Sequence, residues 1–372
     1  MFTLGETLLV YNGLVLICLF FLTGKKNPRK AYIAFFFLAF FAAIRYDVGA
    51  DYDGYYYDVR NVKEVFDGGA DSFWGQLQLI AVGPIFSSLV YVLRHTSYTI
   101  LYIVAIYSIA EIILLYKVLD KYNALFWGAM LYVISCLMFN VWDLLKQGLA
   151  IMLVLNAIPY MEKRDLKTFS IYVFIAGLAH YTAWLFFPMY WVCKKQFSYK
   201  TAMWIIGILF ILAQFGAFNS AAAFLTQSIP YYSESYSEHV NYTISGETTH
   251  DASYIFTVCW YVVLITLAPK RLNIFKILMF IGACIYIMSG GNLLMDRIAL
   301  YFSSSMLLYF SEVYNNLPKG SLKKNTVLVM LFMMFALFDI RIHAMTYKGS
   351  TPYETIFSEE CRQEVFRSNG DE

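Results

Sequence analysis

Charged residues are scarce in this sequence. Only 15% of its 372 residues are Asp, Glu, Lys or Arg and 59% are apolar, against about 25% and 45–50% in soluble domains. Apolar runs recur from Leu8 to Asp339 without a polar stretch long enough to fold separately, so we expect one membrane domain, 1–372. A net charge of +2 lacks the basic surface that nucleic-acid binding needs, and we expect no nucleic-acid partner.

Metal and disulfide motifs are also lacking. The six cysteines form no CxxC pair, and most lie in or beside apolar segments, which is typical of buried thiols. Asp51-Tyr-Asp53 resembles the DxD metal motif of soluble sugar transferases only superficially, because the nucleotide-binding strand-and-helix context is missing. We therefore expect neither a metal nor a cofactor.

The first apolar run is not expected to be a cleaved signal peptide. The first apolar run, Met1 to Gly24, has no basic residue before its core and carries Glu6, whereas basic residues follow it. This pattern predicts a retained helix with its N-terminus outside.

Apolar segments that suit a bilayer are abundant. A helix needs about 20 apolar residues to cross, and its backbone must be satisfied within the segment. Candidate spans lie near 5–23, 30–47, 98–116, 124–140, 146–161, 201–218, 253–268, 274–290, 293–310 and 326–342. Two stretches are ambiguous: 76–94 is broken by Gly83-Pro84, and 168–193 is long for one crossing and short for two.

Each ambiguous stretch can either cross the membrane once or not, which allows two topologies. Basic residues decide between them, because they prefer short cytoplasmic loops. Most of them fall in six clusters: Lys25, Lys26, Arg29, Lys30; Lys117, Lys121; Lys163, Arg164, Lys167; Lys194, Lys195, Lys200; Lys270, Arg271, Lys276; and Lys319, Lys323, Lys324. All six are cytoplasmic only if 76–94 does not cross and 168–193 is a hairpin turning near His180. This predicts an all-α protein with about 12 transmembrane helices, a re-entrant or interfacial helix and both termini outside. If both stretches cross once instead, the second and third clusters move outside.

Two long outer loops and a short outer tail follow from this topology. The loops are about 45–75 and 219–253, and the C-terminal tail is 343–372; no Lys or Arg occurs between Lys200 and Lys270. Both loops mix tyrosines with carboxylates or hydroxyls, which suits stacking on sugar rings and binding of their hydroxyl groups. The tyrosines could instead form an aromatic belt at the membrane interface.

Charges among apolar residues mark candidate functional positions, because they are costly unless they pair or line a wet cavity. Arg45, Lys146 and Arg297 are expected at outer helix ends, where three cations would suit a diphosphate. Loss of Arg45 or Arg297 should spare folding if both are wet. Asp143 with Lys146 and Asp296 with Arg297 could instead only neutralise each other.

A histidine lies in the apolar stretch IAGLAHYTAWLF. His180 is either a hydrogen-bonded core residue or a group that contacts substrate and accepts a proton.

Several motifs together resemble those of the EpsG-like and Wzy-like polysaccharide polymerases. The most specific is IRYDVGADYDGYY at 44–56, where an apolar helix ends in Arg, an aromatic residue and a short Val-Gly-x-Asp-Tyr stretch. The further matches, in order along the chain, are Lys146-Gln147, His180 with Pro188, Arg297 with Tyr301, and Pro352-Tyr353.

The resemblance implies a metal-independent glycosyl transfer on the outer face of the bacterial cytoplasmic (inner) membrane. Polyprenyl-diphosphate-linked glycans would be donor and acceptor, with membrane lipid around them and a chain-length regulator and flippase of the same pathway as partners. It implies the catalytic residues Arg45, Asp51, His180 and Arg297, and the substrate-binding residues Tyr46, Tyr52, Lys146, Gln147 and Tyr301. Cations would stabilise the leaving diphosphate, and Asp51 or His180 would take the acceptor proton.

Two other functions remain open. A lipid-linked glycan flippase would also use outward cations, but no paired repeats or broken helices in both halves are visible. A membrane O-acyltransferase uses a histidine within the bilayer, but it would need a second polar partner, and Gly177 and Trp184 lie near His180 at helical spacing instead.

Overall fold

The computed structural model describes residues 3–24, 27–68, 73–195, 197–219, 252–289, 292–344 and 349–361. These residues are helical apart from turns and one isolated antiparallel bridge, Arg45 with Thr355, which confirms the all-helical prediction. The chain forms two compact units, Met1–Phe187 with Leu331–Glu372, and Pro188–Met330. Each unit is described by itself.

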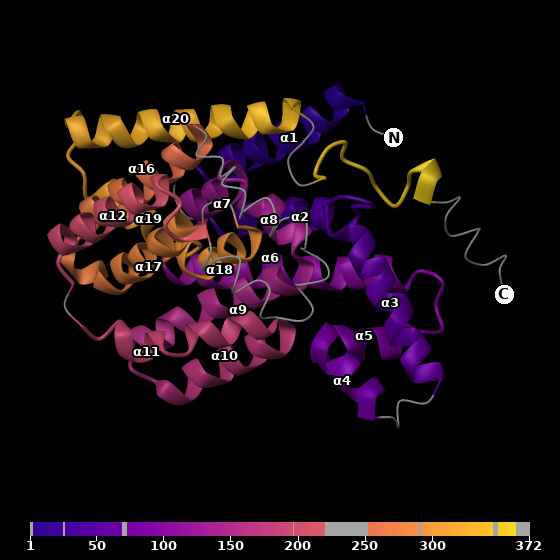
Figure 1. The fold of residues 1–372 in the computed structure, drawn as a ribbon. Helices are drawn as coiled ribbons and strands as arrows, with labels where there is room; N and C mark the ends of the chain where they lie inside the picture. The colour runs from indigo at the N-terminus through magenta and orange to yellow at the C-terminus, as the bar shows by residue number, and fades with distance from the viewer. Residues whose placement is uncertain are drawn as a thin grey trace. The chain divides into compact units, whose positions relative to one another are not determined.

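The first unit contains most of the described helices (Figure 1). They are α1 (Leu4–Leu22), α2 (Pro28–Ala43), α3 (Tyr52–Asp67), α4 (Phe73–Val82), α5 (Pro84–Leu93), α6 (Thr99–Lys121), α7 (Leu125–Ile134), α8 (Leu137–Asp143), α9 (Leu145–Glu162), α10 (Leu166–Ala179) and the 3-10 helix η1 (Tyr181–Phe186). The last long helix, α20 (Leu322–His343), begins in the second unit and continues in the first.

Local sequence signals explain where several helices begin. Thr3 and Glu6 form a reciprocal capping box at α1. Asn27 accepts hydrogen bonds from two backbone N–H groups at the start of α2, and Pro28 occupies the first helical position. The Asp165 carboxylate caps α10, and its hydrogen bonds to Thr168 lower its pKa.

Helix α9 forms the core of the first unit. It is apolar around most of its circumference, and nearly all its side chains are buried, as expected of a helix packed on all sides. It packs against α6 and α10, and α6 also packs against α2 (Figure 1). The Asn156 side chain of α9 donates to the Leu114 carbonyl of α6 over 3.0 Å, which satisfies a polar group in this apolar interface.

Four helical segments in the described residues are long and apolar enough to cross a membrane. They are Leu4–Leu22, Thr99–Lys121, Lys270–Ser289 and Leu322–His343. Two bent pairs would raise the number to six: α7 with α8, bent by 66°, and α18 (Leu293–Ser303) with α19 (Met306–Asn315), bent by 51°. Each of the ten predicted spans coincides with a helix or a bent pair, but the number of about 12 crossings is not confirmed.

The described residues of the first three basic clusters lie at one end of the first unit. Near the start of α2, Tyr32 lies against Tyr116 at the end of α6, with ring centroids 5.2 Å apart. Beside them the Tyr122 hydroxyl donates to Glu162, and the Lys121 ammonium lies 4.5 Å above the Tyr160 ring. The ends of α2, α6 and α9 that carry these clusters are therefore adjacent, which supports the topology in which 76–94 does not cross.

The two ambiguous stretches each contain a break. Residues 76–94 form α4 and α5, two ten-residue helices separated at Gly83, whose φ of 114° favours glycine. A ten-residue helix is about 15 Å long, too short to cross a hydrocarbon core of about 30 Å. In 168–193 the chain reverses at His180, as predicted, and Trp184 packs back on Phe174. The second arm begins as a 3-10 helix rather than an α-helix.

The two predicted outer loops differ in what the structure describes. The first, 45–75, is mostly helix, because α3 occupies its centre and α4 begins within it. The second, 219–253, lies almost wholly outside the described residues.

The second unit is built around α17. It comprises α11 (Met189–Val192), α12 (Tyr199–Gln214), α16 (Ala252–Leu267), η2 (Lys270–Leu272), α17 (Asn273–Ser289), α18 (Leu293–Ser303) and α19 (Met306–Asn315). Helix α17 packs against α12, α16 and α18. Gly282 permits its close approach to α18, because a Cβ there would lie 3.2 Å from the Ser303 nitrogen.

Candidate functional site

Arg45 follows the apolar helix α2, and several contacts fix the position of its side chain. Its side chain is 1% exposed; Nη1 donates to the Ala42 carbonyl and to the Ser108 hydroxyl, each at 2.6 Å. Nη2 donates to the Trp142 carbonyl at 3.2 Å, and the guanidinium lies over the Trp142 ring. The expectation that Arg45 is wet is therefore wrong, because the guanidinium joins α2, α6 and α8 in a buried position. Folding is now expected to depend on Arg45 rather than to tolerate its loss.

The C-terminal segment holds the chain around Arg45 from the other side. Tyr46 and Ile356 donate backbone hydrogen bonds across the bridge to Glu354 and Ile44, at 3.0 and 2.9 Å. Tyr353 is completely buried, and its hydroxyl donates to the Phe41 carbonyl at 2.7 Å. Part of the predicted outer tail thus packs against the motif of residues 44–56.

Burial also changes the pKa of one acidic residue in this segment. Desolvation, with the nearby carboxylates of Glu360 and Asp47, raises the pKa of Glu354. The neutral form of Glu354 therefore favours the packed segment.

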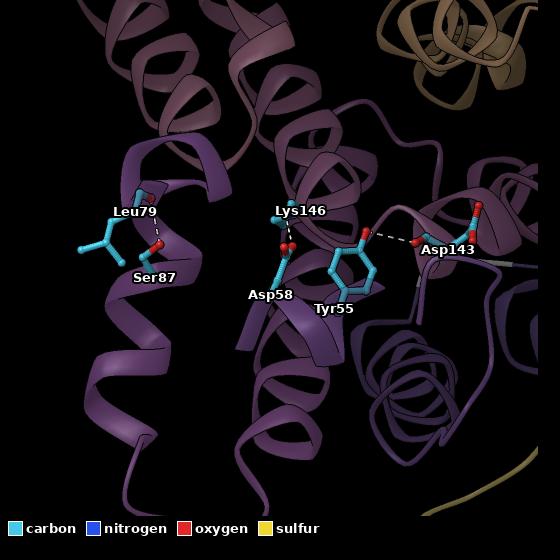
Figure 2. A network of polar contacts seen from close by, with 6 residues as sticks. All are labelled: Tyr55, Asp58, Leu79, Ser87, Asp143 and Lys146. Carbon is cyan, nitrogen blue, oxygen red and sulfur yellow. Dashed lines mark hydrogen bonds and ion pairs between the residues drawn. The ribbon is translucent and has the colours of Figure 1, made fainter. Parts of the chain in front are cut away.

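Asp143 joins α8 to the start of α3. This carboxylate is 3% exposed, and it accepts a hydrogen bond from the Asp51 backbone N–H at 2.9 Å. The Tyr55 hydroxyl donates to the Asp143 carbonyl at 3.1 Å (Figure 2). Gly49, with a φ of 122°, allows the close approach, because a Cβ there would lie 3.1 Å from the Asp143 Cα atom.

Lys146 forms a second link between α9 and α3. Its ammonium lies 2.7 Å from the Asp58 carboxylate, and both side chains are 13% exposed (Figure 2). The same ammonium lies over the Phe86 and Tyr55 rings, at 5.2 and 5.5 Å from their centroids. Asp143 accordingly does not act as the ion-pair partner that the sequence offered as an alternative: Lys146 pairs with Asp58, 88 positions away.

His180 lies at the end of α10 beside the break between α4 and α5. Its Nδ1 is 2.7 Å from the Thr182 hydroxyl, and its ring stacks on Tyr181. A Cβ on Gly83 would lie 3.2 Å from the carbonyl of Ala179 and 4.0 Å from the Lys146 side chain. The end of α10 that carries His180 therefore lies against the break at Gly83, which the Lys146 side chain also approaches.

A pocket of about 500 Å³ is lined mainly by α3, the turn after α5 and the start of α6, and its volume is within the size range of small-molecule sites. Tyr46 and Tyr52, both predicted to bind substrate, line it together with Tyr56, and we call it the tyrosine pocket. Its charged lining residues are Arg60, Lys63, Glu64, Asp67 and Arg94, and His95 and Cys361 also line it. Aromatic faces beside cations and carboxylates can bind a sugar ring and an anionic group together.

The other predicted site residues do not line this pocket. Asp51 lies at the start of α3 next to Asp143, and Gln147 is 3% exposed within α9. Arg297 and Tyr301 are buried on α18 of the second unit. The predicted convergence of Arg297 with Arg45 and Lys146 stays a prediction.

Two buried acidic residues, Asp58 and Glu111, were not among the site residues predicted from the sequence. Asp58 was counted only among the loop carboxylates, since its partner is remote in sequence. Glu111 is the one charged residue of the apolar stretch 98–116, a signal that sequence alone offered, because charge in such a segment is costly. No group of three His, Cys, Asp or Glu side chains that could hold a metal occurs within the described ranges.

Comparison with known proteins gives one match. The sequence profile of the EpsG family matches residues 31–355, a region that includes both halves of the bridge at Arg45, Asp58, Lys146, His180 and Arg297. No curated protein and no solved structure matches the chain. With most of its length covered by this profile, the chain belongs to the EpsG family.

Proposed function

We propose that this protein polymerises polyprenyl-diphosphate-linked oligosaccharide repeat units on the outer face of the cytoplasmic membrane, without a metal ion. The match to the EpsG family, which is associated with a glycosyltransferase-like polymerase activity, carries the proposal. Long apolar helices support a membrane location, and the tyrosine pocket supports a glycan substrate.

In the proposed reaction a hydroxyl oxygen of the acceptor glycan attacks the anomeric carbon of the donor. The bond from that carbon to the diphosphate breaks, the polyprenyl diphosphate leaves, and the hydroxyl proton passes to a base. Asp51 and His180 are our candidates for the base, because each lies at the end of a helix next to the junction of α3 with α9.

The structure changes the roles that we assign to the cations. Arg45 and Lys146 have internal partners, so we assign them to holding α3 in place. Arg60, Lys63 and Arg94 line the tyrosine pocket and become our candidates for binding the donor diphosphate. Tyr46, Tyr52 and Tyr56 would contact its sugars.

The proposed orientation places the tyrosine pocket outside and the first three basic clusters inside. Reporter fusions after Lys121 and Arg164 should therefore give a cytoplasmic signal, while a fusion near Gly68 gives an outside signal. A fusion in the second predicted loop, at 225–250, should also report the outside. Cytoplasmic signals from both loop fusions would reverse the orientation and rule out an outward-facing pocket.

The deletion phenotype tests the reaction itself. A strain lacking this protein should still make and export a single repeat unit but no long polymer, which gel electrophoresis and mass analysis of surface glycan would detect. A flippase would leave repeat units on the cytoplasmic lipid carrier, and an acyltransferase would change decoration without changing polymer length. Normal-length polymer in that strain, with no second polymerase gene present, would contradict the proposal.

A further inference from the structure

Glu111 is a buried acid that the proposed reaction does not use. It lies in the middle of α6, is 1% exposed, and is the one charged residue of an otherwise apolar stretch. An uncompensated charge at such a position is costly, so a compensating group is expected nearby.

The neighbouring helix leaves room for this carboxylate. A Cβ on Gly148 of α9 would lie 2.6 Å from Glu111 Oε1 and 2.8 Å from the Val141 carbonyl. A larger residue at position 148 would require both the Glu111 carboxylate and the Val141 backbone to move. The packing of α6 against α9 therefore holds the Glu111 side chain at the start of α9, just beyond Asp143 and Leu144.

Arg45 is the candidate for the compensating group. It lies close enough to Glu111 for the guanidinium and the carboxylate to act on each other electrostatically. Ser108, which accepts a hydrogen bond from Arg45 Nη1, lies one turn before Glu111 on the same helix. No direct ion pair joins Arg45 to Glu111 in the part of the chain that the structure describes, so their attraction acts over a longer distance.

Polar atoms without a direct partner surround the two charges. Arg45 Nε, Glu111 Oε1 and the hydroxyls of Tyr107 and Tyr132 are buried and accept or donate no hydrogen bond within the described residues. Tyr107 lies one turn before Glu111 on α6, and the charges of both Arg45 and Glu111 act on Tyr132. Buried polar groups of this kind are ordinarily bridged by ordered water, which makes about three hydrogen bonds.

We propose that Glu111 is the water-bridged counter-charge of Arg45 and acts as a positioning residue for the tyrosine pocket. Arg45 holds the Trp142 carbonyl, and the next residue, Asp143, holds Asp51 and Tyr55 at the start of α3. Helix α3 in turn places Tyr52 and Tyr56 in the pocket wall. Glu111 does not line the pocket, so its effect on catalysis passes through Arg45.

A double-mutant cycle on the full-length protein in lipid nanodiscs tests the pairing. Glu111→Gln and Arg45→Gln should each lower the melting temperature, because each leaves one buried charge uncompensated. The double variant should lose less than the sum of the two shifts. Shifts that simply add would overturn the pairing. Glu111→Asp, which keeps the charge, should retain most of the melting temperature and keeps the test usable if Glu111→Gln does not fold.

Infrared difference spectra of wild type against Glu111→Asp test the charge state, because the ionised form gives carboxylate bands. A protonated-acid carbonyl band would overturn the proposal, since a neutral Glu111 cannot balance Arg45. This readout and the melting cycle are independent of the proposed function.

The positioning role rests on the proposed function and is tested by complementing the deletion strain. At equal protein level, Glu111→Gln should lower the amount of long polymer about 100-fold, as small displacements of a site commonly do, and Glu111→Asp should restore most of it. Glu162→Gln, at the opposite end of α9, is the matched control and should leave polymer unchanged. Wild-type polymer from Glu111→Gln would overturn the positioning role. A deletion strain with normal polymer would instead contradict the proposed function and leave the pairing to the melting cycle.

Discussion

Replacement of Arg45 by Gln is expected to lower the free energy of unfolding by about 3 kcal/mol or more and to abolish long polymer. The substitution removes the Arg45 donor from the Ser108 hydroxyl and the Trp142 carbonyl, and it leaves the Ala42 carbonyl with the Ser108 hydroxyl as its remaining donor. A buried polar group that loses its partner costs about 1–3 kcal/mol. Denaturation of the purified protein and polymer analysis of the complemented strain would measure the two effects.

Two variants make the Arg45 result interpretable. Arg29→Gln, on an exposed arginine at the start of α2, should change neither stability nor polymer. Arg45→Lys keeps the charge but cannot reach three acceptors as a planar fork does, so an intermediate loss is expected. An Arg45→Gln protein as stable as wild type would show that the buried hydrogen bonds do not hold the three helices together.

Loss of one partner of the Lys146–Asp58 pair is expected to cost about 3 kcal/mol of stability and most of the polymer. Breaking a buried ion pair by removing one member typically costs 3–5 kcal/mol, and the 13% exposure of both side chains favours the lower end. Asp58→Asn and Lys146→Met should also loosen α3, which limited proteolysis between residues 52 and 67 would detect.

The exposed pair Arg60–Glu64 on the same helix gives a matched control for stability. Its side chains are 68% and 62% exposed, so Glu64→Gln should cost only about 0.3–0.5 kcal/mol. The double variant Asp58→Asn with Lys146→Met should be more stable than the sum of the single losses implies. Lys146→Arg should be tolerated, because a guanidinium can pair with Asp58 through two hydrogen bonds. Equal losses from the buried and the exposed pair would remove the argument that Lys146 anchors α3.

The sequence by itself determined the helices of the predicted spans, the membrane class and the family, but not α3, which lies within the predicted outer loop 45–75. Each predicted span coincides with a helix or a bent pair, because runs of apolar residues between polar punctuation are a local signal. The break at Gly83-Pro84 and the reversal at His180 were also local, since glycine, proline and an interrupted apolar run mark them directly. The motif at 44–56 was specific enough to indicate the family that the profile match confirms.

Only the tertiary structure decided which polar groups meet. Arg45 was expected to be wet at a helix end, yet α6, α8 and the C-terminal segment bury it. Lys146 has an acidic neighbour three positions away but pairs with Asp58, and Asp143 instead holds the backbone of Asp51. Helical periodicity says which residues share a face of one helix, but it carries no information on the register between helices that lie far apart along the chain. For that reason the predicted cations Arg45 and Lys146 became supports of the site. Tyr46 and Tyr52 of the pocket wall were predicted from the family resemblance, whereas its cations were found only from their positions in space.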